Sequence, residues 1–399
     1  MRNGIKKLAA LGMIGIMAMS AVACGKTDKK ESGNNASTKH ATIGVAFYQD
    51  AGKAPTATKA YLESLSEELN VEFKYTVFSQ TDEAANVTKV QELISSGVDG
   101  ILATMDLGTT SIIEECKAAG VYYAGFLCDF NNSFTTANDK VFKNDHFLGA
   151  IADGNLPDNV VDGTQFFDSL VEYNDAHKDA PITHVSMAIF PAFAFPNQTT
   201  AAQQFVAAVD EYNKTADVKI TVDPLNEETD VLQFSPLNST YFAKHPETQA
   251  IISFAAGTSF VYPTMVAAGV DKNIKLFTSG YEGGEEANFG SAGAQTYQQC
   301  TVSGIEAVTY PLVLLLNKIN GASFPDQPAN AERISSDKII VNSDDDMKAF
   351  LKNIYSTGKA EDAKWTGKDV LNMTAFGNDK ATYADLVKNV QSLTIDNMK

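Results

Sequence analysis

One stretch, residues 82–106 (DEAANVTKVQELISSGVDGILATMD), constrains the fold more than any other. Its first half predicts a helix, because apolar residues recur at helical spacing and Asp82 can accept from the free N–H groups of a first turn. Gly97 stands where a left-handed residue commonly ends a helix. The apolar run 100–105 then predicts a strand covered on both faces. It ends on Asp106, at the edge where an open parallel sheet binds ligands.

The same alternation of strand and helix recurs along the whole chain. The first half has predicted strands at 42–48, 71–78, 100–105 and 121–127, helices at 55–69, 82–96 and 109–119, and a fifth strand beginning at 140–142. The second half has predicted strands at 182–190, 218–222, 250–254 and 274–278, and helices at 147–176, 198–213, 231–243 and 260–268. A long helix at 301–320, a strand at 338–341 and a last stretch of helices and turns follow. Repeated βαβ units predict an α/β fold with two halves, each built on a parallel sheet.

The amino-terminal 23 residues predict a signal peptide rather than part of the fold. Three basic residues precede an apolar run that is too short to span a membrane comfortably. The sequence Ala21-Val-Ala-Cys24 resembles a bacterial lipobox, in which the cysteine is acylated after cleavage, although such sites usually have Leu where Ala21 stands. The alternative is an ordinary secretory peptide cut near Ala23. Both interpretations predict export.

A polar stretch at residues 24–40 predicts a flexible tether that would hold a globular body away from a membrane. Without the signal, 28 basic residues face 49 acidic ones, a formal charge of −21. This acidity argues against nucleic acid and against a polybasic membrane contact. Arg333 is then the one arginine left, so bidentate capture of phosphate or carboxylate is poorly supported.

The residues that usually carry catalysis or bind metals form no recognisable set. The five histidines have no HxxxH or HExxH spacing, and no nucleotide-binding glycine motif follows a strand. Cys116, Cys128 and Cys300 remain beside Cys24, and a Cys116–Cys128 bridge is left open. We therefore expect no metal, no cofactor and no enzyme activity; a hydrolase using Asp106 and Glu282 is the weakest alternative.

The order of elements resembles the type I periplasmic binding proteins, in the ribose- and galactose-binding branch of ABC-transporter receptors. The resemblance is carried by residues 43–45 (IGV), 91–101 (QELISSGVDGI) and 275–283 (KLFTSGYEG), and it covers about 41–341. It implies two doubly wound lobes joined by a three-strand hinge, with ligand enclosed by closure. Lobe 1 would comprise 41–145 and 279–325. Lobe 2 would comprise 146–278 and 326–399, which includes a C-terminal extension.

The resemblance also implies which residues contact the ligand. They follow strand ends, where carboxylates and amides can meet hydroxyl groups: Tyr48, Gln49, Asp106, Asp129, Asn197, Glu282 and Gln298. Three departures concern the identity of the sugar: residues 51–56 lack the usual Asn and paired aromatics, no second-lobe arginine is present, and residues 191–196 (PAFAFP) are unusually apolar.

The function implied is a lipid-anchored, monomeric receptor of an ABC importer, located outside the cytoplasm at the cell membrane. It would take a small neutral polyhydroxylated ligand, a sugar above others, and deliver it to membrane permease subunits. The alternatives are a nucleoside or other ring-bearing ligand, favoured by the aromatic 190–195 region, and a ligand-sensing subunit for a membrane kinase.

Overall fold

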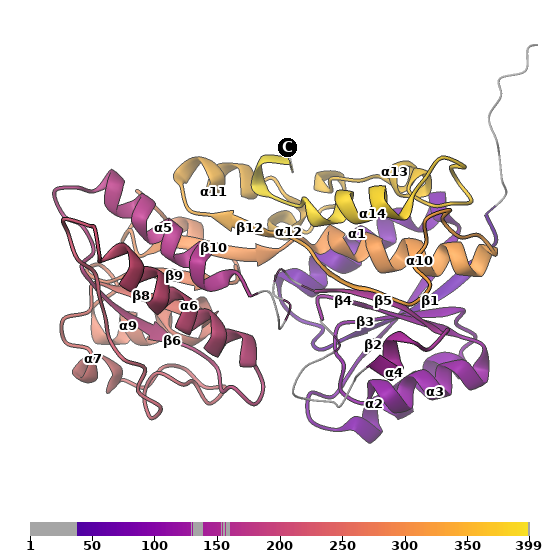
Figure 1. The fold of residues 1–399 in the computed structure, drawn as a ribbon, viewed down its shortest axis with the longest axis horizontal. Coiled ribbons are helices and arrows are strands. Elements are labelled where there is room, and N and C mark those ends of the chain that lie inside the picture. Colours follow the sequence, from indigo (N-terminus) through magenta and orange to yellow (C-terminus); the bar gives the residue numbers. More distant parts are fainter. Residues whose placement is uncertain are drawn as a thin grey trace, which may run out of the picture. The chain divides into compact units, whose positions relative to one another are not determined.

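Two six-stranded sheets organise the computed structural model, which describes residues 38–128, 130, 139–152, 154, 156 and 160–397 (Figure 1). The first sheet is parallel throughout, in the order β11 (Arg333–Ser335), β5 (Phe147–Ala152), β4 (Tyr122–Phe126), β3 (Gly100–Ala103), β1 (Ala41–Phe47) and β2 (Val71–Val77). The second has the order β12 (Lys338–Val341), β10 (Tyr297–Ser303), β9 (Lys275–Ser279), β8 (Ala250–Ala256), β6 (His184–Ala188) and β7 (Thr221–Val222). Its pairs are parallel except β10 with β12. The predicted α/β fold with two parallel-dominated sheets is confirmed.

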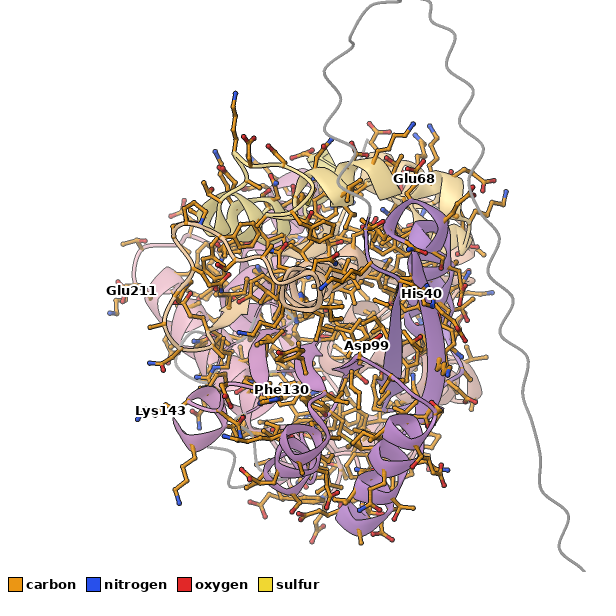
Figure 2. The ribbon with its side chains drawn as sticks, turned by 90° about the vertical axis from the view of Figure 1, so that its right-hand side faces the viewer. His40, Glu68, Asp99, Phe130, Lys143 and Glu211 are labelled. Carbon is orange, nitrogen blue, oxygen red and sulfur yellow. The ribbon has the colours of Figure 1, made fainter. Side chains whose placement is uncertain are left out.

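The helices of the first half are α1 (Lys53–Leu69), α2 (Glu83–Ser95) and α3 (Thr109–Ala119), which the sequence predicts, together with the short α4 (Asp139–Phe142) and the later α10 (Thr309–Asn320). In the segment 82–106, the Asp82 side chain accepts from the Ala85 N–H (3.0 Å) and caps α2. Gly97 takes the left-handed conformation at φ +83°. Asp99, labelled in Figure 2, then joins β3 to β1, because its carboxylate accepts from the Thr42 N–H at 2.8 Å.

The second half carries α5 (Asp162–Ala176), α6 (Pro196–Tyr212), α7 (Tyr241–Lys244), α8 (Gly257–Phe260) and α9 (Tyr262–Ala268). Short 3₁₀ turns, η1 (Glu285–Asn288) and η2 (Ile305–Val308), follow β9 and β10. The α5–α6 pair and the inner face of the second sheet enclose their own hydrophobic cluster, which contains Phe166, Phe205 and Phe277. No helix in the described ranges is long and apolar enough to cross a membrane.

Several predicted elements differ from the structure. Residues 140–142 lie in α4 rather than in a strand, and Phe142 packs edge-on against Phe147 at 5.1 Å between ring centroids. The helix predicted at 147–176 begins only at Asp162, because residues 147–152 form β5 and pair with β4 and β11. Residues 231–240 are irregular, and only α7 remains of the helix predicted at 231–243. The predicted 301–320 helix is the end of β10, η2 and then α10, because Thr301 and Val302 pair with β9 or β12.

The sheet order divides the chain differently from the boundaries drawn on the sequence. β5 and β11 lie in the first sheet, whereas residues 146–278 and 326–399 were expected in lobe 2. β9 and β10 lie in the second sheet, although 279–325 was expected in lobe 1. The sheet to which a strand belongs is decided by its pairing with strands far away in the sequence, and the local hydrophobic periodicity carries no information on that pairing. The chain crosses between the sheets after β5, after β10 and after β11, which agrees with a three-strand hinge.

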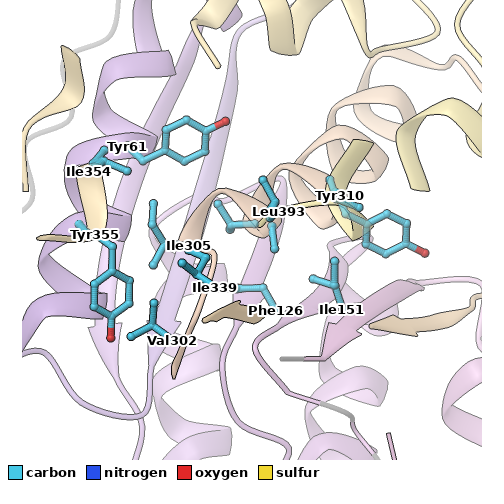
Figure 3. Packing of buried hydrophobic residues seen from close by; sticks show 14 of the residues in the cluster. Tyr61, Phe126, Ile151, Val302, Ile305, Tyr310, Ile339, Ile354, Tyr355 and Leu393 are labelled. Carbon is cyan, nitrogen blue, oxygen red and sulfur yellow. The ribbon is translucent and has the colours of Figure 1, made fainter. Parts of the chain in front are cut away.

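The C-terminal extension contacts both halves. It contains α11 (Asp344–Phe350), α12 (Ile354–Thr357), η3 (Ala360–Asp362), α13 (Gly367–Asn372), α14 (Tyr383–Gln391) and η4 (Ile395–Asn397). α11 contacts β12 of the second sheet, whereas α12 and α13 contact α1 and α14 contacts α10 (Figure 1). Figure 3 shows side chains of the extension (Ile354, Tyr355 and Leu393) in one hydrophobic cluster with residues of both sheets.

The cysteines are not joined by disulfides among the described residues. The Cys116–Cys128 bridge that the sequence left open is therefore absent from this structure. Burial raises the pKa of Cys116 to about 12, so it is an unreactive core thiol. Cys24, the signal peptide at 1–23 and the tether up to residue 37 lie outside the described residues.

Candidate ligand-binding site

Two predicted ligand contacts, Tyr48 and Gln49, lie directly after β1 at the carboxyl end of the first sheet. Both are exposed, and 38% of the Tyr48 surface is accessible. The Tyr48 N–H donates to the Thr104 hydroxyl (2.8 Å), which ties this loop to the residue that follows β3. The backbone is thus held in place while the two polar side chains reach solvent.

Asp106 follows β3 as predicted, but its side chain has no exposed surface. Its carbonyl oxygen accepts from the Thr109 N–H (3.2 Å) and hydroxyl (2.7 Å), which fixes the start of α3. Burial raises the pKa of Tyr123 well above its ordinary value, and Cys116, Cys128 and Asp106 add to the rise, so Asp106 lies beside the core of the first half. A ligand on the exposed edge would not touch this carboxylate without a rearrangement, and its ligand role stays a prediction.

Glu282 lies three residues beyond β9, at the carboxyl end of the second sheet. Its carboxylate accepts from the Ser259 hydroxyl of α8, the short helix directly after β8. Burial raises the pKa of Glu282 despite the Ser259 hydrogen bond, and the charge of Glu285 adds to the rise. This oxygen-rich group can accept from the hydroxyl groups of a solute.

Sequence reasoning missed the residues that hold Glu282 in place. The buried Glu285 carboxylate accepts from the N–H groups of Glu282 (2.7 Å) and Gly283 (2.8 Å) and from the Thr258 hydroxyl (2.6 Å). The signal was the acidic, glycine-containing run at 282–286 directly after a strand, in which only the first acid was selected.

A junction of three segments brings the two halves together near these loops. The Lys53 ammonium of α1 donates to the Ser356 carbonyl of the extension (2.7 Å) and lies 5.9 Å from the centre of the Tyr281 ring. Phe350 of the extension packs edge-on against Tyr281 at 5.0 Å. Burial raises the pKa of Tyr355, and Tyr48, Glu285 and Glu282 add to the rise, so Tyr355 lies near both predicted ligand loops.

The remaining predicted residues are placed differently. Asn197 is partly exposed in the first turn of α6, and Asp129 lies outside the described residues. Gln298 lies at the start of β10, where Tyr297 is in register with Leu276 of β9. It therefore lies at the amino end of the second sheet, opposite Glu282, and its side chain donates to the Gln295 carbonyl (2.8 Å). The structure thus brings Tyr48, Gln49 and Glu282 to carboxyl edges but does not bring Gln298 there.

Two histidines that looked scattered in the sequence are joined by hydrogen bonds. The Asp223 carboxylate bridges His184 Nε2 (2.7 Å) and His245 Nδ1 (2.7 Å), and His245 Nε2 contacts the buried Asp230 at 2.9 Å. This row of hydrogen bonds holds β6, the end of α7 and the 223–230 loop together. No cluster of three or more His, Cys, Asp or Glu residues in the described ranges could hold a metal ion.

Comparisons with known proteins agree on the fold. No protein-family model and no curated protein matches the chain. Among solved structures, an ABC transporter solute-binding protein from Agrobacterium vitis bound with alpha-D-tagatopyranose is 15% identical, with a TM-score of 0.55 over 77% of this chain and 96% of its own. A periplasmic solute-binding protein from Actinobacillus succinogenes with bound D-allose is 13% identical, with a TM-score of 0.56 over 77% and 99%.

A third neighbour has a different described role. It is a LacI transcriptional regulator from Bacteroides fragilis, 11% identical, with a TM-score of 0.51 over 78% of this chain and 99% of its own. Because one fold hosts several functions, the likeness carries architecture and not activity. The chain has the α/β fold of the type I periplasmic binding proteins, as the sequence predicted.

Proposed function

We propose that this protein is a solute-binding receptor of an ABC importer that captures a small neutral polyhydroxylated ligand, a sugar, by closure of its two lobes. The observation that carries the proposal is the position of Tyr48 with Gln49 and of Glu282 with Ser259 at the carboxyl ends of two parallel sheets. Open parallel sheets bind ligands at this edge. Two neighbours with this fold are described with a bound sugar, tagatose or allose.

The setting of the receptor rests on the sequence. Cleavage before Cys24 and its acylation would anchor the protein outside the cytoplasm, and residues 24–40 would let the body reach permease subunits. A monomer with no cofactor and no catalytic step is sufficient for this role. The regulator's function is not supported for this chain, because a formal charge of −18 opposes binding to nucleic acid.

Isothermal titration and melting of the purified protein with four sugars (D-tagatose, D-allose, D-galactose and D-ribose), a nucleoside (uridine) and a glycoside (phenyl β-D-glucoside) test the proposal. A ligand at a hundred times its dissociation constant should add about 2.7 kcal/mol to the free energy of unfolding. Glu282→Gln removes the charge but keeps the shape and should weaken binding about tenfold or more, because hydrogen bonds to charged groups are the stronger ones. Lys219→Gln, on an exposed segment before β7, is the matched control. A panel of sugars, nucleosides and glycosides that gives no heat and no stabilisation would refute the proposal.

A further inference from the structure

Five phenylalanines pack together at the carboxyl ends of β6 and β8, and we refer to them as the phenylalanine platform: Phe190, Phe193, Phe195, Phe234 and Phe260. The Phe190 ring lies at the centre, with centroids 5.2 Å from Phe195, 5.3 Å from Phe234 and 5.0 Å from Phe260. Phe193 joins through Phe234 at 6.3 Å. These separations are typical of packed aromatic pairs, so the platform is one continuous surface.

The outer rings of the platform are exposed although they are apolar. Accessible fractions are 65% for Phe193, 51% for Phe234 and 39% for Phe195. Phe234 also adopts a positive φ of 56°, which is unfavourable for a bulky side chain. Phe234 thus combines an exposed ring with a strained backbone, and exposed apolar patches and strained residues both cluster at functional sites.

The platform is held in place by its backbone. The loop after β6 pairs with the 231–238 segment, because the Leu232 N–H donates to the Ile189 carbonyl at 2.8 Å. The same segment reaches α8, because the Leu237 N–H donates to the Phe260 carbonyl at 2.6 Å. The rings are thus carried by two loops and one short helix that are joined by backbone hydrogen bonds.

These three segments carry no charge in a chain in which a fifth of the residues are charged. Residues 189–197, 231–238 and 256–261 contain no Asp, Glu, Lys, Arg or His. A surface of this kind favours contact with a neutral, flat and apolar group, for which aromatic rings give extensive contact.

The platform adjoins the polar group of the candidate site. Ser259, which donates to the Glu282 carboxylate, directly precedes Phe260, whose ring packs on Phe190. The residue that donates to the Glu282 carboxylate and a ring of the platform are therefore neighbours in α8. A single small solute can meet both when its own polar and apolar parts are adjacent.

We propose that the ligand joins a hydroxyl-bearing sugar to a flat aromatic ring, as in a nucleoside or an aryl glycoside, with the face of the ring on the phenylalanine platform and the hydroxyl groups at Glu282. This inference rests on the proposed receptor function and specifies its ligand class. A free monosaccharide would leave the outer rings of the platform uncovered.

Titration calorimetry with four solutes tests this inference: uridine and D-ribose, and phenyl β-D-glucoside and D-glucose. The two members of each pair carry the same sugar and differ in the aromatic ring. Comparing the two pairs shows whether the platform prefers a nucleobase or a phenyl ring. We expect at least one ring-bearing solute to bind tenfold or more tightly than its free sugar. Phe193→Ala should remove roughly tenfold or more of that affinity, as for bases that lose an aromatic stacking partner, and should leave the melting temperature unchanged. Phe234→Ala gives a second test from a different loop.

Val218→Ala removes an exposed apolar side chain away from the platform and should change nothing. If free sugars bind as tightly as their ring-bearing partners and Phe193→Ala has no effect, this inference is overturned while the receptor function stands. If no solute of either kind binds, both are overturned.

Discussion

The two sheets share one topology but differ at their carboxyl edges. In both, the strand order runs as the second, first, third, fourth and fifth strands of that half, followed by one late strand. The first edge presents the polar side chains of Tyr48 and Gln49. The second presents the acidic Glu282, held by the buried Glu285, beside an uncharged phenylalanine platform. A shared framework therefore positions the ligand, and the loops of each half decide which part of the ligand it meets.

The halves also differ in how their outer strands and helices are covered. The late strand β11 is parallel in the first sheet, whereas β12 is antiparallel in the second. Most of the extension packs over α1 and α10 of the first half. We therefore expect the first half to be the more resistant to unfolding.

The largest expected effect comes from a cavity in the second half alone. Phe205→Ala should lower the free energy of unfolding by about 3–5 kcal/mol, because Phe205 is fully buried between α6 and the second sheet. The single tryptophan, Trp365, lies in the extension and reports on a different cluster. In urea, circular dichroism should therefore show loss of structure before the Trp365 fluorescence changes.

The matched variant for this comparison is Ile112→Ala, which removes buried volume from the first half. In this variant the urea midpoint of the Trp365 fluorescence should fall together with the urea midpoint of the circular dichroism. If both variants shift both signals equally, the two halves unfold as one cooperative unit, and the expected difference in resistance is wrong.

A smaller effect is expected at the crossover between the halves. Glu306 in η2 is fully buried; one carboxylate oxygen accepts from the Lys364 N–H at 3.4 Å, and the other has no partner within the described part of the chain. Burial raises the pKa of Glu306, so the folded protein holds this proton more tightly than the unfolded chain. The contribution of Glu306 to the free energy of unfolding is therefore fully present below the ordinary carboxyl pKa, and it is lost as the pH rises through the raised pKa of the folded state.

Glu306→Gln should therefore stabilise the protein by about 1–3 kcal/mol near neutral pH, the scale of a buried unsatisfied polar group. The gain should shrink towards pH 4, where the carboxyl is protonated in both states. Melting curves from pH 4 to 8 measure the difference between the variant and the natural protein. A gain that is independent of pH would contradict a buried, titrating carboxylate.

The smallest effect concerns the extension on the first half. The Tyr383 hydroxyl contacts the Tyr310 hydroxyl (2.8 Å) and donates to the Glu332 carboxylate (2.8 Å), so Tyr383→Phe should cost about 1 kcal/mol. Tyr75→Phe removes a comparable bond to Glu63 on an exposed surface and should cost less. Urea midpoints compare the two, and equal losses would show that the extension is not specially anchored here.

The sequence predicts the local units well because each carries its own signal. Asp82, Gly97 and the apolar run before Asp106 define a capped helix and a buried strand without reference to the rest of the chain. Sheet membership is different, since β5 and β10 are assigned by partners far away in the sequence. For this reason the observed sheets divide the chain differently from the predicted lobes, and residues 301–320 do not form the single helix that their apolar run predicts.

The candidate site follows the same rule. Glu282 is predictable because it follows a strand, and the acidic run at 282–286 also indicates Glu285, whereas nothing in the sequence joins Ser259 to Glu282. The apolar 191–196 segment is visible in the sequence, but Phe234 and Phe260 come from separate segments, so the sequence does not show the size of the platform. Gln298 was selected by its place in the chain order, although the register of β10 carries it to the opposite edge.

Hydrogen–deuterium exchange with and without a bound solute tests the central claim most directly. The account predicts slower exchange at both edges together: around Tyr48 and Gln49 after β1, and around Glu282 and Phe193 in the second half. Enclosure by two lobes requires both changes at the same ligand concentration. Protection confined to one half, with the other half unchanged at saturating ligand, would contradict capture by lobe closure.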